Sequence, residues 1–168
     1  MAEFLPGLTP FTTWLAASPV SQGIGERAWI TPSVQSLHIM AIAVVMSGML
    51  MIDLRLLRVV GKDQSVQSYT QRYLPWVWWS ILILFLSGSS LIVGEPRRSL
   101  QSAVFALKMG LLIAGAALAL IVQISAGKNA SFWETPGRRA LAKLIAAASM
   151  LIWMCIIFAG RWIAYAQG

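Results

Sequence analysis

Four long stretches of this 168-residue sequence contain no charged residue. A hydrocarbon layer of about 30 Å is crossed by a helix of about 20 apolar residues, and each stretch meets or approaches that length. The stretches are Ala28–Ile52, Tyr73–Gly94, Met109–Gly127 and Leu144–Gly160. They do not alternate polar and apolar residues as the strands of a membrane β-barrel do. The sequence therefore predicts an all-α protein, an antiparallel bundle of four transmembrane helices at about 33–57, 74–94, 102–125 and 141–165.

The composition also favours a protein surrounded by lipid. Hydrophobic residues make up 58% of the chain and charged residues only 11%, with a mean hydropathy of +0.71. A chain of this length cannot bury so much apolar surface inside one small globule, so membrane lipids are the expected contacts. We expect a single membrane domain over residues 1–168. The net charge of +7 is explained by loop residues, and no nucleic-acid partner is predicted.

Basic residues are distributed unevenly between the two sides of the predicted bundle. Lys and Arg in short loops mark the cytoplasmic side of a membrane protein. Eight of them flank the connections after the first and third helices, namely Arg55, Arg58, Lys62, Arg72, Lys128, Arg138, Arg139 and Lys143. The other side carries Arg27, Arg97, Arg98, Lys108 and Arg161. This bias predicts that both termini lie outside and that the two longer connections lie in the cytoplasm.

A short helix is predicted before the first span, at about residues 10–18. Thr9 is suited to cap it, Pro10 to occupy its first position, and Ser18-Pro19 to end it. Its apolar residues share one face, as expected of an amphipathic helix lying in the membrane interface: Phe11, Trp14 and Leu15.

His38 is the only histidine of the chain and lies inside the first apolar stretch. Three roles are open to it: a hydrogen-bonding residue near the interface, a ligand of a cofactor or metal, or a proton carrier. Ionisable groups within a membrane are costly and usually face a cavity or a partner. On the predicted topology Glu95, Lys108 and Arg161 lie toward the same outer side, so the four residues could form a polar pocket for an anionic or carbonyl group. For Lys108 the competing interpretation is that its stem carries the ammonium to the interface.

Methionines and small residues offer further candidate sites. Thioether and imidazole ligands together suit copper, and Met150 and Met154 share a helix face with each other, although methionine more often fills gaps in a core. A haem b would need His38 together with a Met, or two copies of the chain, because one histidine cannot supply two axial ligands. Small residues spaced four apart allow helices to approach closely, either within the bundle or between subunits: Gly110 with Ala114, and Gly115 with Ala119.

Charged residues also lie at the cytoplasmic end of the first span. Arg55 and Arg58 are one turn apart and suit anionic lipid headgroups, with Asp53 available to pair with one of them. The sequence contains no nucleophile elbow, P-loop, carboxylate pair or zinc motif, so a non-catalytic protein is expected.

Several segments resemble an uncharacterised family of bacterial four-helix inner-membrane proteins, a domain of unknown function. The resemblance covers most of the chain and rests chiefly on WLAASPVSQGIGERAWITP, SLHIMAIAVVMSG and MIDLRLLR, with Lys108 and Trp133 matching further on. The family looks distantly like the membrane domains of copper-resistance D proteins and, more loosely, like cytochrome-b bundles. Members often carry a second histidine at the end of the third helix, which this chain lacks.

The resemblance implies a location in the bacterial inner membrane but no reaction. The leading interpretation is an accessory or anchoring subunit, in a homo-oligomer or a larger membrane complex, with a polar outer pocket around His38. The alternative is a redox or metal-handling protein that binds haem b, quinone or copper through His38 and a methionine. A weaker alternative is a small transporter with Lys108 and Arg161 lining its path.

Overall fold

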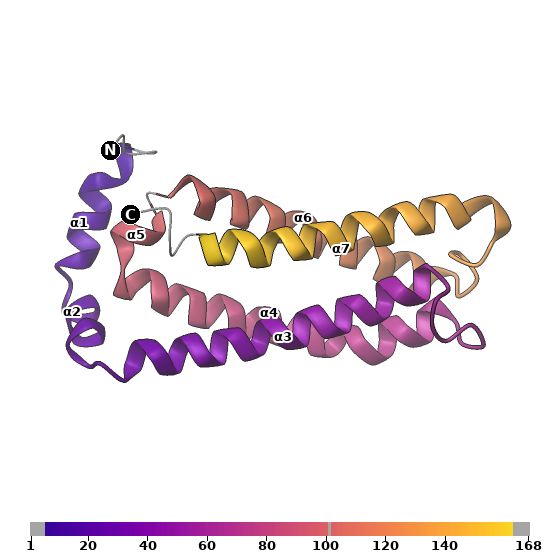
Figure 1. The fold of residues 1–168 in the computed structure, drawn as a ribbon, viewed down its shortest axis with the longest axis horizontal. Helices are drawn as coiled ribbons and strands as arrows, with labels where there is room; N and C mark the ends of the chain where they lie inside the picture. The colour runs from indigo at the N-terminus through magenta and orange to yellow at the C-terminus, as the bar shows by residue number, and fades with distance from the viewer. Residues whose placement is uncertain (1–5, 101, 163–168) are drawn as a thin grey trace.

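The computed structural model describes residues 6–100 and 102–162 and contains only helices as regular structure among them (Figure 1). Four of these helices are long and apolar enough to cross a membrane. They are α3 (Ile30–Leu56), α4 (Val66–Gly94), α6 (Ala103–Lys128) and α7 (Arg139–Trp162). The predicted all-α bundle of four membrane-spanning helices is confirmed. The predicted end of the last helix at 165 lies outside the described residues.

The four long helices form a ring. Helix α3 packs against α4 and α7, and α6 packs against the same two helices from the other side. Helices that follow one another along the chain run antiparallel (Figure 1). The buried core between them is mostly aliphatic and includes Val45, Met49, Ile52, Leu74, Val77, Val122 and Ile156.

Three short helices cover one end of this bundle, which we call the cap end. They are α1 (Thr9–Ala16), α2 (Pro19–Glu26) and α5 (Pro96–Leu100), and they lie at the left of Figure 1. Helix α1 packs on α5, and α2 packs on α4. The α3–α4 and α6–α7 connections lie together at the opposite end, which we call the loop end.

The segment before α3 differs from the single helix predicted at 10–18. Two helices occupy it, because the hydroxyl of Ser18 accepts a hydrogen bond from the backbone N–H of Ser21 and so begins α2 directly after α1 has ended. Thr9 is the first residue of α1 rather than its cap, and Leu8 takes the cap position.

Helix α4 begins eight residues before its predicted start at 74. Its first turn is capped by Ser65, whose hydroxyl accepts from the backbone N–H of Ser68. The helix therefore continues through Arg72 and Pro75 and extends past the apolar stretch that marked it in the sequence.

Glycines set two close contacts between membrane-spanning helices. A Cβ atom added at Gly48 in α3 would lie 2.6 Å from Cγ2 of Val77 in α4. A Cβ atom at Gly115 in α6 would lie 3.3 Å from side-chain atoms of Trp153 in α7. Small residues thus bring neighbouring backbones together where no hydrophobic effect can drive association in lipid.

Candidate functional site

His38 lies two turns inside α3 and reaches across to α4. Its Nδ1 atom is 2.8 Å from Oγ of Ser87, and the imidazole also lies against Gly88. His38 and Ser87 are each ten residues from the contact between Gly48 and Val77, toward the cap end. At the helical rise of 1.5 Å per residue, both residues lie about 15 Å along their helices from that contact. The register that Gly48 sets between α3 and α4 therefore also brings His38 opposite Ser87.

The hydroxyl of Ser87 determines how the imidazole is protonated. Ser87 Oγ is 2.6 Å from the carbonyl oxygen of Ile83, one turn back in α4, and it donates its only hydrogen there. The oxygen can therefore only accept from His38, whose Nδ1 must carry the hydrogen. In the neutral imidazole Nε2 is then the unprotonated nitrogen, whose lone pair can accept a proton or hold a metal.

Lys108 approaches this site from α6. Its Nζ atom lies 3.4 Å from the Cβ position of Gly160 in α7, so the side chain lies along a helix surface that lacks a side chain at that point. Its charge is close enough to act on the imidazole of His38. Among the described residues Lys108 forms no ion pair. His38 and Lys108 thus lie near one another at the cap end, and the polar pocket expected around His38 stays a prediction.

Glu95 and Arg161 lie nearer the surface of the cap end. Glu95 directly follows α4, and Arg161 lies in the last turn of α7 beside Gly160; both side chains are exposed. Their part in a polar pocket around His38 stays a prediction.

The methionines proposed as soft-metal ligands lie on α7. Met154 is half exposed on the surface of the bundle, and Met150 is partly buried. Over residues 6–100 and 102–162, the structure contains no group of three or more His, Cys, Asp or Glu residues placed to hold a metal ion. A role for these methionines stays a prediction.

A second polar region lies toward the loop end, and the sequence did not predict its partners. Asp53 of α3 is 2% exposed and faces Ser149 of α7, which is equally buried. The hydroxyl is close enough to influence the carboxyl, yet Asp53 Oδ2 and Ser149 Oγ lie outside hydrogen-bonding geometry and have no other partner among the described residues. Asp53 therefore does not pair with Arg55 or Arg58.

Arg55 is buried and engaged inside the protein. Its Nη2 atom lies 2.9 Å from Oε1 of Glu134, and its Nε donates to the carbonyl oxygen of Gln64 at 2.6 Å. The ion pair joins α3 to the α6–α7 connection, and the bond to Gln64 joins it to the α3–α4 connection. The headgroup role predicted for Arg55 and Arg58 stays a prediction, and these contacts favour Arg58 for it.

Arg58 occupies an unusual backbone position at the end of α3. Its φ of 60° lies in the left-handed region, where glycine is normally found. The N–H of Arg58 donates to the carbonyl of Arg55 and that of Val59 to Leu54, which is the hydrogen-bond pattern of a Schellman cap. Its Nη2 donates to the backbone oxygen of Glu134 at 3.0 Å. An arginine at a position that favours glycine suggests that its side chain is needed there.

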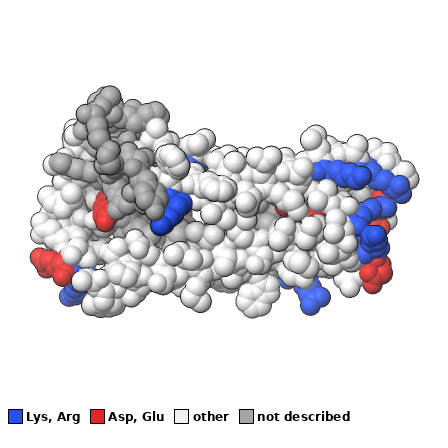
Figure 2. Space-filling model, in the orientation of Figure 1, with Lys and Arg blue, Asp and Glu red and all other residues white. Residues whose placement is uncertain are grey.

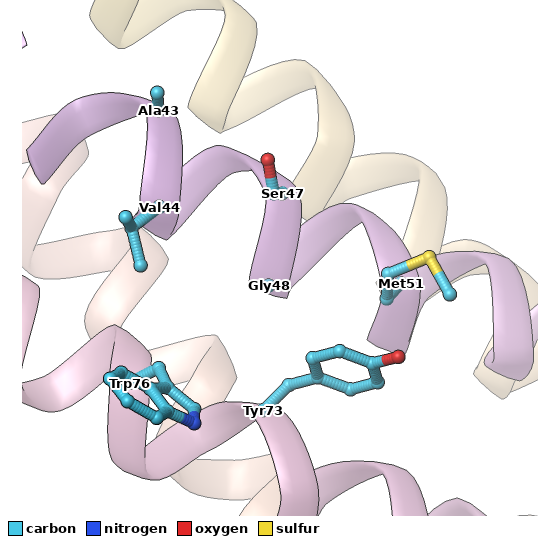
Figure 3. Close-up of a pocket in the computed structure, with 7 residues that line it drawn as sticks. All are labelled: Ala43, Val44, Ser47, Gly48, Met51, Tyr73 and Trp76. Atoms are coloured by element: carbon cyan, nitrogen blue, oxygen red, sulfur yellow. The ribbon is translucent and has the colours of Figure 1, made fainter. Parts of the chain in front are cut away.

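An apolar groove lies on the surface between α3 and α4 (Figure 3). It has a volume of about 340 Å³ and contains Val44, Gly48 and Met51 on one side and Tyr73 and Trp76 on the other. Its apolar lining suits the lipid contact expected of these helices.

Fold and polar residues together define a polytopic four-helix membrane protein with ionisable groups buried near both ends of the bundle. Residues 23–166 match the family of unknown function DUF6644, and the chain belongs to that family. No curated protein and no solved structure matches the chain significantly.

Proposed function

We propose that this chain is a non-catalytic protein of the bacterial inner membrane, with both termini outside, that serves as an accessory or anchoring subunit of a membrane complex. The observation that carries the proposal is the outward face of α6. This helix is the least buried of the four membrane-spanning helices. Over two turns its outward side carries three exposed small residues, Gly110, Ala114 and Ala117, beside the exposed Ile113.

The contrast with the other small pair of α6 supports this interpretation. Gly115 and Ala119 are buried, and Gly115 packs against Trp153 of α7 within the bundle. A Cβ atom at Gly110 meets nothing within 4 Å. Small residues at this spacing let a second helix approach closely. Within the bundle no helix packs against the exposed Gly110, so this face remains available to another chain.

The test compares wild-type protein with two double variants extracted in mild detergent. Gly110→Leu with Ala114→Leu fills the outward face of α6, whereas Ala140→Leu with Ala147→Leu adds similar bulk to exposed positions of α7. We expect the wild type and the α7 control to migrate as a larger assembly on native mass spectrometry, and the α6 variant to be released from it. A wild-type protein that is monomeric under these conditions would contradict the proposal.

A second candidate function follows from the free Nε2 of His38. The hydrogen bond from Nδ1 to Ser87 fixes the ring and its tautomer, as the hydrogen-bond partner of a metal-binding histidine usually does. The chain could thus hold haem b, copper or a quinone at the cap end, with Lys108 facing an anionic or carbonyl group. A methionine would have to complete the coordination of a metal.

An absorption spectrum, metal analysis and quinone extraction on protein purified from the membrane test this candidate. A bound group that is lost in His38→Ala and weakened in Ser87→Ala, but retained in the control Ser90→Ala, would support it. Ser90 is a suitable control because it too bonds to its own helix, at Leu86, on α4. Protein without a Soret band, metal or quinone would eliminate the candidate.

A further inference from the structure

Three basic side chains surround a cavity at the loop end. The cavity has a volume of about 210 Å³ and lies between the end of α3 and the start of α7. Arg58, Arg139 and Lys143 contribute its charges, and the exposed Arg139 and Lys143 come from the first turns of α7. Figure 2 shows Lys and Arg gathered at this end of the molecule.

The positive charge of this cavity is not neutralised within the described chain. The nearest acidic residue along the α6–α7 connection is Glu134, and its carboxylate is already paired with Arg55. Arg58 uses one of its five N–H groups on the backbone oxygen of Glu134. Its other N–H groups, together with Arg139 and Lys143, make no ion pair with any described residue.

The remaining walls are apolar and aromatic. Leu56, Leu57, Ala142 and the indole of Trp133 complete the lining. Trp133 is 4% exposed, and its Nε1 has no hydrogen-bond partner in the described part of the chain. A buried N–H group without an acceptor is rare, but this nitrogen is closed off from the cavity as well as from the surroundings, so the indole contributes a wall and not a hydrogen bond.

We propose that this cavity binds the phosphate of an anionic lipid headgroup. Its volume is several times that of a water molecule, which occupies about 30 Å³ in the liquid. It lies where two membrane-spanning helices end, at the depth of the headgroups, and basic pockets at such positions hold anionic lipids. The leucines and the indole lie beside the charges, where the glycerol and the first acyl carbons of the lipid would be.

The experiment measures lipid binding to purified protein by native mass spectrometry, with phosphatidylglycerol, phosphatidylcholine and inorganic phosphate as separate probes. Arg139→Gln with Lys143→Gln removes two exposed charges from the cavity. Lys62→Gln with Arg72→Gln is the matched control, because it removes one lysine and one arginine that are exposed at the loop end but do not line the cavity. A third variant, Trp133→Phe, keeps the ring and removes the N–H group.

We expect phosphatidylglycerol to bind more tightly than phosphatidylcholine. Each basic residue near anionic headgroups contributes about fivefold in affinity, so the cavity variant, which lacks two of them, should bind phosphatidylglycerol roughly twenty-five-fold more weakly. Trp133→Phe keeps an aromatic wall and should change binding little, as should the control. If the two double variants lost affinity for phosphatidylglycerol equally, the lipid would be bound by the general positive charge of the surface, and the proposed site would be wrong. Equal binding of phosphatidylcholine, or competition by inorganic phosphate as effective as that by the lipid, would overturn the assignment to an anionic lipid.

Discussion

The contact between Gly48 and Val77 determines how closely α3 and α4 approach, and Gly48→Ala tests it. The added Cβ would lie 2.6 Å from Cγ2 of Val77, which is fully buried. A valine in a helix has essentially one rotamer, so its methyl group cannot turn away. Overpacking of this kind costs about 1–3 kcal/mol, and the better helix propensity of alanine returns about 1 kcal/mol. We therefore expect Gly48→Ala to lower the free energy of unfolding by about 1 kcal/mol.

The sign of the effect should reverse when the clashing methyl group is removed. In a Val77→Ala background the new Cβ has room. Gly48→Ala should then raise the free energy of unfolding by about 1 kcal/mol, because alanine has the better helix propensity. The two effects differ by about 2 kcal/mol, which is the coupling that a double-mutant cycle measures. Gly110→Ala is the control in α6, since nothing lies within 4 Å of its Cβ, and it should stabilise in both backgrounds.

The assay is unfolding by sodium dodecyl sulfate in mixed micelles, followed by the fluorescence of the eight tryptophans. Because Gly48 and His38 share one helix register, Gly48→Ala should also loosen the His38–Ser87 hydrogen bond, seen as a changed imidazole chemical shift in NMR spectra. If Gly48→Ala stabilises the wild-type protein as much as Gly110→Ala does, the helices are not in the close contact described here and the reasoning is refuted.

Three further predictions use the same unfolding assay. Arg58→Gly should be more stable than Arg58→Ala by about 1 kcal/mol, since only glycine adopts the left-handed conformation without strain; equal stability would argue against that backbone conformation. Asp53→Asn should leave stability unchanged or raise it, because Asp53 Oδ2 has no partner and an amide can bond to Ser149; a large loss would reveal a cation bound to the carboxylate. Glu134→Ala should cost about 2 kcal/mol, because it leaves the buried Arg55 unpaired while Glu134 itself is partly exposed; no loss would show that the ion pair is replaced by water.

The spans were predictable because length and hydropathy alone decide whether a helix can cross lipid. Helix ends were less predictable, since they depend on caps rather than on hydropathy. The hydroxyl of Ser65 extends α4 beyond its apolar stretch, and that of Ser18 begins a helix where the sequence suggested only an end. Both serines are visible in the sequence as cap signals, so this part of the fold could have been found.

Partners distant along the chain could not be predicted in the same way. His38 stood out as the only histidine, but Ser87 is 49 residues away and is one serine among many. Arg55 suggested a lipid contact because it ends an apolar helix, whereas its partner Glu134 is 79 residues away. The sequence also marked two small-residue pairs in α6 without indicating which of them faces inward. The packing of Gly115 on Trp153 decides that, and it exists only in the folded bundle.

The proposal that the outward face of α6 is an interface can be tested in the native membrane. A photo-crosslinker attached to Ala114→Cys, in a chain where the half-buried Cys155 is replaced by serine, probes that face. Leu151→Cys, at a position of α7 that is 66% exposed in the wild type, probes a different surface. We predict that the label at position 114 crosslinks to a second polypeptide and that the label at 151 gives mainly lipid adducts. A label at 114 that captures only lipid would contradict the assignment of this protein as a subunit of a larger assembly.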